Sequence, residues 1–193
     1  MRTTLALASA LAAATAFAQP AALEHTDLSR GLTLPPTSPA LADEATAPLV
    51  NPAGLMQVRS AQLFYGHERS VARNDVIDGL YLSNTLLELL AVGVSVEWIR
   101  NSSLPALSFP DRRKTTWSLA FGSPSFALGA AFSFFSSEEN SSLDHASGID
   151  LGLLVRPSRV LSIGAVVKNV NAPQLELASL PRSYDLGFGV RPF

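Results

Sequence analysis

The chain has 193 residues, of which 16% are charged and 47% are hydrophobic, and its formal net charge is −2. It has no cysteine, which excludes disulfides, thiolate metal sites, cysteine catalysis and a lipid anchor on a processed cysteine. Its two lysines, Lys114 and Lys168, lie far apart and there is no basic excess, so no nucleic-acid partner is expected. The 13 prolines and 12 glycines favour short strands joined by turns over a helical bundle.

The first residues predict a secretory signal peptide. Arg2 precedes an apolar stretch over residues 5–14, and the run from Ala16 to Ala18 has the small-x-small arrangement of a cleavage site. We therefore expect Sec-type export and removal of residues 1–18. No later segment offers the roughly 18 uncharged apolar residues of a transmembrane helix, so any membrane embedding is expected to use strands.

Residues 19–56 are predicted to form an irregular N-terminal arm or hatch. Prolines 35, 36, 39, 48 and 52 are expected to interrupt any regular element there. Residues 57–193 then contain stretches of about ten residues separated by turn signals, which predict eight strands. The predicted strands cover residues 57–67, 77–86, 89–100, 113–122, 125–136, 147–156, 159–170 and 183–191.

The predicted strands alternate between bulky and small side chains. In the third strand Val94 and Trp98 share one face, whereas Gly93 and Glu97 share the other, because side chains change face at every residue. The less bulky face is mostly Gly, Ala and Ser, which is typical of a crowded lumen rather than of a surface in water. The pattern predicts an all-β, antiparallel up-and-down transmembrane β-barrel of about eight strands with its bulky face toward lipid. A soluble periplasmic β protein is the alternative.

Short turns alternate with long polar connections along the chain, as in outer-membrane barrels. Four aromatic residues are predicted to form a girdle on the bulky face near the long connections. They are Trp98, Trp117, Phe134 and Tyr184. Phe121 and Phe126 are expected near the short turns.

Two Val-Arg-Pro runs, at residues 155–157 and 190–192, occupy the same point of the repeat. The second run leads into no further strand, so we expect the eight strands to be an incomplete portion of a larger barrel. The alternative is a self-contained barrel in which Phe193 is the terminal aromatic residue recognised by the barrel-assembly machinery.

A family resemblance rests on residues just before the first predicted strand. The motif consists of Asp43 within Leu-Ala-Asp-Glu-Ala, followed by Asn51, Pro52, Ala53, Gly54 and Leu55. This motif resembles the amino-terminal signature of the FadL-type and PorV-type outer-membrane barrels. The later run at residues 164–170, with Leu180-Pro181 and the closing Arg191-Pro192, is similar to the PorV type. The resemblance implies a larger barrel with the arm folded into or across its lumen. More narrowly, the chain resembles the barrel-like N-terminal region of some bacterial proteins described as signal peptide peptidases.

No motif for catalysis, a cofactor or a metal is found, and an enzyme is not predicted. The histidines at positions 25, 67 and 145 lack partner spacing, and His25 beside Glu24 and Asp27 is interpreted as part of a solvated arm rather than a metal site. Five charged residues are predicted to face the lumen, where they stabilise it or line a path. They are Glu97, Asp150, Lys168, Asp185 and Arg191.

These observations predict a protein of the Gram-negative outer membrane, with lipid and the barrel-assembly machinery as partners. The resemblance implies passage or binding of hydrophobic molecules, or docking of exported proteins. The alternative is a non-catalytic membrane anchor in a longer protein that carries a protease domain. A soluble periplasmic β protein is the third hypothesis.

Overall fold

The computed structural model describes residues 31–35, 37–70, 75–101, 111–137, 144, 146–175, 178–179 and 181–191. The predicted signal peptide, His25, His145, Leu180, Pro192 and Phe193 lie outside the described residues.

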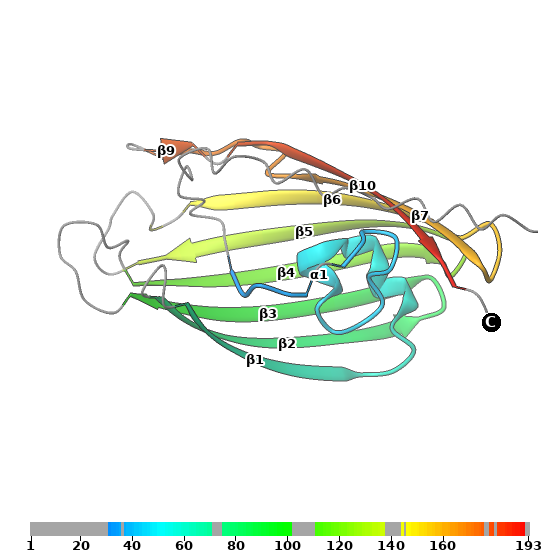
Figure 1. The fold of residues 1–193 in the computed structure, drawn as a ribbon, viewed down its shortest axis with the longest axis horizontal. Helices are drawn as coiled ribbons and strands as arrows, with labels where there is room; N and C mark the ends of the chain where they lie inside the picture. The colour runs from blue at the N-terminus through cyan, green and yellow to red at the C-terminus, as the bar shows by residue number, and fades with distance from the viewer. Residues whose placement is uncertain are drawn as a thin grey trace, which may run out of the picture.

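Eight long strands form one antiparallel sheet in chain order (Figure 1). They are β1 (Gln62–Ser70), β2 (Asp75–Leu87), β3 (Leu90–Asn101), β4 (Arg112–Ser123), β5 (Phe126–Ser136), β6 (Ser147–Val155), β7 (Leu161–Lys168) and β10 (Ser183–Val190). The all-β, up-and-down prediction is confirmed. In the predicted polar connection before β10, β8 (Gln174–Leu175) and β9 (Ala178–Ser179) pair with each other in a separate two-stranded sheet.

The eight strands form an open sheet. β1 pairs with β2 and β10 pairs with β7, and the described residues show no pairing between β1 and β10. An eight-stranded barrel has an interior just wide enough for side chains. Here the inner face also carries a segment of backbone, residues 31–58, which such a barrel has no room to enclose. The barrel prediction therefore holds only as an open, curved sheet (Figure 1).

The two faces of the sheet differ as the alternation predicted. Ala91, Ser95 and Glu97 of β3 are buried on the face that residues 31–58 cover, which we call the inner face. The opposite, outer face exposes large apolar side chains from every long strand. They include Leu63, Leu82, Trp98, Trp117, Leu119, Phe121, Phe126, Leu128, Phe132, Phe134, Leu151, Leu161, Tyr184, Leu186, Phe188 and Val190.

The arm, residues 31–58, contains two short helices, α1 (Ala47–Val50) and the 3-10 helix η1 (Pro52–Gln57). Pro48 and Pro52, which were expected to interrupt regular structure, instead lie in the first turn of α1 and η1, where a missing N–H costs nothing. Pro35 and Pro39 lie outside helices and strands, as expected. Because η1 continues to Gln57, β1 begins at Gln62 rather than at residue 57. No helix in the described part of the chain is both long and apolar enough to cross a membrane.

The arm packs on the inner face through small and apolar side chains. Leu55 and Ala53 of η1 are fully buried and join a cluster with Ala120, Ala127 and Leu154 of the sheet. The arm thus supplies the other half of the core for a sheet whose outer face is apolar and exposed.

For orientation, the end of the sheet with the short β2–β3, β4–β5 and β6–β7 connections is called the short-turn end. The opposite end, where residues 71–74, 102–111 and 137–146 connect strands, is called the long-loop end.

Candidate functional site on the inner face

Asn51, the first residue of the Asn-Pro-Ala-Gly-Leu motif, ties the arm to itself and to the sheet. Its side-chain oxygen caps η1 by accepting a hydrogen bond from the Ala53 N–H, at 3.0 Å. Its Nδ2 group donates to the carbonyl of Pro39 at 2.8 Å and to the carbonyl of Leu153 in β6 at 3.0 Å. Asn51 is fully buried, so all three contacts are shielded from water. The motif is therefore a docking element between arm and sheet.

Glycines on the inner face allow the motif to lie directly on the strands. A Cβ at Gly129 of β5 would overlap the backbone of Ala53, and one at Gly152 of β6 would overlap the side-chain oxygen of Asn51. Within the arm, a Cβ at Gly54 would overlap the carbonyl of Ala42. The side chains at these inner-face positions are therefore small because the backbone of the arm lies directly on the strands.

Glu97 holds the beginning of the described arm. This predicted lumen residue of β3 is fully buried, and its Oε1 accepts hydrogen bonds from the Leu32 N–H at 2.6 Å and the Tyr81 hydroxyl at 2.7 Å. Lys114, its cross-strand neighbour on β4, places Nζ 3.8 Å from Oε2. A buried carboxylate needs such partners.

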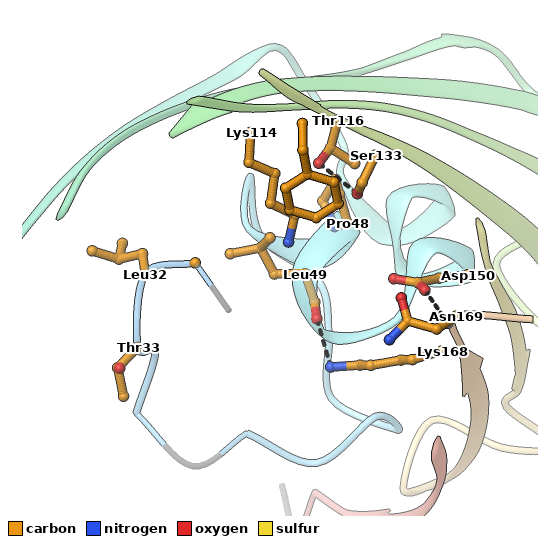
Figure 2. A pocket seen from close by; sticks show the side chains of 12 residues that line it. Leu32, Thr33, Pro48, Leu49, Lys114, Thr116, Ser133, Asp150, Lys168 and Asn169 are labelled. Carbon is orange, nitrogen blue, oxygen red and sulfur yellow. Dashed lines mark hydrogen bonds between the residues drawn. The ribbon is translucent and has the colours of Figure 1, made fainter. Parts of the chain in front are cut away.

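A polar cavity of about 240 Å³ lies between the arm and strands β4 to β7, on the long-loop side of α1 (Figure 2). The Lys168 ammonium donates to the carbonyl of Leu49 at 3.2 Å, and Asp150 accepts from the Asn169 N–H at 2.8 Å. Lys168 also lies 4.0 Å from Asp185. Of the predicted lumen residues, Lys168 therefore contacts the arm and Asp185, whereas Asp150 contacts the backbone that follows β7.

Arg191, the fifth predicted lumen residue, lies apart from this cavity at the short-turn end. Its Nη2 lies 2.5 Å from Oδ2 of Asp43, the acidic residue of the arm motif. Arg156 reaches the same carboxylate oxygen at 3.9 Å and donates to the Gln57 side chain at 2.5 Å. The two Val-Arg-Pro runs of the sequence therefore meet at one aspartate, a role for Arg156 that was not predicted.

The electrostatics around Arg156 are unfavourable. Burial, followed by the positive charge of Arg191, lowers the pKa of the Arg156 guanidinium, while Asp43 acts in the opposite direction. Asp43 therefore only partly offsets the proximity of the two arginines.

The predicted aromatic girdle lies on the outer face. Trp98, Phe134 and Tyr184 are exposed within three residues of the long-loop ends of their strands. Trp117 is also exposed, but it lies in the middle of β4.

A polar cluster at the long-loop end of β1 to β3 was not predicted. Asp78 accepts from the Tyr65 hydroxyl at 2.7 Å, contacts Nδ1 of His67 at 2.8 Å and forms an ion pair with Arg100. Tyr65 and His67 lie on β1, Asp78 on β2 and Arg100 on β3, so the pairing register brings the three strands' side chains together. Within the described residues, no group of three His, Asp or Glu side chains is arranged to hold a metal ion.

A groove of about 600 Å³ runs between the arm and β10. Leu34, Leu49 and Val50 line it from the arm, and Tyr184 and Leu186 line it from the strand. Lys168 and Asp185 are the charged residues in its wall. The wall of the groove therefore combines apolar side chains with the charged groups of Lys168 and Asp185.

The inner face thus combines a docked arm, a polar cavity and a groove with both apolar and charged residues in its wall. The chain matches no protein-family model, no curated protein and no solved structure at a significant level.

Proposed function

We propose that the chain is an outer-membrane protein similar to the FadL and PorV types, with its outer face in lipid and its arm as a plug. The observation that carries the proposal is the continuous apolar outer face. Soluble monomers rarely expose apolar patches larger than a few hundred Å². Here Leu82, Trp117, Leu128, Leu151 and Phe188, from five different strands, are all exposed.

The dimensions of this face fit a membrane. From Phe126 to Phe134, β5 presents apolar residues outward over about 27 Å, at about 3.3 Å per residue. A strand tilted by about 40° needs about ten residues to cross the apolar band of an outer membrane, which is about 25 Å tall. The inner face, which a soluble sandwich would pack against a second sheet, is occupied by the arm instead.

Substitution on the outer face tests membrane insertion. Leu128→Arg places a charge in the middle of β5, where an arginine in lipid costs about 2–4 kcal/mol. We expect this variant to fold poorly into phospholipid vesicles, measured by urea titration and by heat-modifiable gel mobility. Ser136→Arg, at the long-loop end of the same strand and face, should insert like the unmodified chain.

Folding in water without lipid or detergent, unaffected by Leu128→Arg, would contradict the proposal. In that case the exposed leucine would be an ordinary surface position, where substitutions change stability by at most about 0.5 kcal/mol.

The groove beside β10 favours binding of hydrophobic molecules over docking of exported proteins. Its volume of about 600 Å³ lies within the usual range for small-molecule sites, and Lys168 at its wall can meet a polar or acidic end group. The groove opens beside Leu186, which belongs to the exposed apolar face. A hydrophobic molecule in the membrane can therefore reach it without crossing water.

Photolabelling tests this part of the proposal. A long-chain alcohol with a diazirine group should label residues that line the groove, read by peptide mass spectrometry. Leu49→Trp fills the groove and should reduce this labelling several-fold, whereas Leu63→Trp, exposed on β1, should not. Equal labelling in both variants would point to a membrane protein that binds nothing in this groove.

A further inference from the structure

A second cavity, of about 670 Å³, lies at the short-turn end. It is formed by the end of η1, the β4–β5 and β6–β7 connections and the end of β10. Four arginines line it and no lining residue is acidic. They are Arg59, Arg156, Arg159 and Arg191. Such a concentration of guanidinium groups is expected where an anion binds.

The arginines have too few acidic partners within the described residues. Asp43 pairs with Arg191 at 2.5 Å and is 3.9 Å from Arg156, whereas Arg59 and Arg159 form no ion pair there. The Nε and Nη2 atoms of Arg156 are buried without a hydrogen-bond partner. Buried donors left unpaired are costly, so the arginine cluster has fewer hydrogen-bond acceptors than its donors require.

One side of the cavity is apolar and joins the outer face. Val160 and Leu161 line the cavity and are each 38% exposed. Val190, which pairs with Leu161 across β7 and β10, is 65% exposed. A ligand with its charge among the arginines could therefore extend an apolar part along these strands. This combination favours a lipid over an acidic peptide.

We propose that this cavity binds the phosphate group of an anionic phospholipid, with the acyl chains lying along Leu161 and Val190. The inference rests on the proposed membrane placement of the outer face, because only then does a lipid leaflet meet the short-turn end. Guanidinium groups bind phosphate oxygens with paired, charge-assisted hydrogen bonds. The positive cavity disfavours a zwitterionic headgroup that carries its own cation.

Lipid binding by the full chain in maltoside micelles tests the site. Native mass spectrometry, with micelles doped with phosphatidylglycerol or phosphatidylcholine, reports how much of each lipid stays bound. We expect phosphatidylglycerol to bind at least tenfold more tightly than phosphatidylcholine. Arg159→Gln and Arg59→Gln, which remove no ion pair within the described residues, should each weaken it about tenfold. Arg113→Gln, an exposed arginine at the long-loop end, is the matched control and should leave binding unchanged.

Two further competition measurements identify the source of the phosphate. Inorganic phosphate should compete only at much higher concentration than the lipid, because it lacks the contacts with Leu161 and Val190. The lipid assignment would be overturned if free phosphate competed for the cavity as strongly as the lipid does. It would also be overturned if an acidic peptide competed for the cavity and the lipid did not. Equal binding of both lipids, or equal weakening by Arg113→Gln, would overturn the site.

Membrane placement is scored separately by urea extraction of the same variants from membranes. If the unmodified chain and the arginine variants stay in the membrane but the unmodified chain binds no phosphatidylglycerol, only the proposed lipid site is refuted. Release of the unmodified chain by urea refutes the proposed function. Binding of inorganic phosphate to the released chain then decides whether an anion site exists.

Discussion

At the scale of single residues, Glu97 has the clearest structural role. It is a fully buried carboxylate that joins β2, β3 and the arm through Tyr81 and the Leu32 N–H. Burial of a charge is unfavourable unless hydrogen bonds and opposite charges surround it. Its position on the inner face could be predicted from alternation. Its attachment to Leu32, 65 residues earlier, could not.

Replacement of Glu97 should release the start of the described arm. Glu97→Ala removes the acceptor of the Leu32 N–H, so we expect hydrogen exchange at this amide to accelerate about tenfold or more. Glu97→Gln keeps a carbonyl oxygen at the same place and should preserve most of the protection. Exchange measured by mass spectrometry on the segment around Leu32 gives the result. Equal acceleration in both variants would assign the effect to the lost charge instead.

At the scale of elements, the arm and the sheet are matched surfaces. Pro52 and Ala53 of η1 lie against Gly129 of β5, and Asn51 lies against Gly152 of β6. The glycines weaken their strands intrinsically, because glycine loses the most conformational freedom on folding. Close contact with η1 offsets this cost. The arm is therefore part of the core rather than a tether.

A methyl group placed in this contact should push the arm away from the sheet. Gly129→Ala places a Cβ against the backbone of Ala53, which has no flexible end to move aside, so we expect the free energy of unfolding to fall by about 1–3 kcal/mol. Gly148→Ala on β6 is the control, because its Cβ would meet only side chains, Asn169 at 3.1 Å and Ser133 at 3.9 Å. Urea unfolding followed by tryptophan fluorescence measures both. A larger loss for Gly148→Ala would contradict this account.

At the scale of the whole molecule, the sheet is inverted relative to a soluble sandwich. Large apolar side chains cover its outer face, and the face toward the arm combines small and polar residues with a few buried large ones such as Ile99 and Leu154. Charged residues bound the apolar outer face at both ends, with Arg100 and Arg113 at the long-loop end and Arg159 at the short-turn end. This order of polar, apolar and polar zones follows the profile of a bilayer.

The strands and their faces were predictable because alternation is local: neighbouring side chains point to opposite faces whatever the strand packs against. The pattern therefore located eight strands and assigned Trp117, Leu128 and Gly129 to their correct faces. The prediction was wrong for Pro48 and Pro52, since the same residue that breaks a helix also begins one.

By itself, the sequence determined the periodicity of the sheet, its turns and the chemical contrast between its faces. Only the tertiary structure decided that the sheet stays open and that Asn51 donates a hydrogen bond to the Leu153 carbonyl. It also decided that Arg156 and Arg191 both approach Asp43. The physical reason is distance along the chain. Contacts between residues about 100 or more positions apart depend on how the arm docks, and no local pattern of side chains encodes that docking.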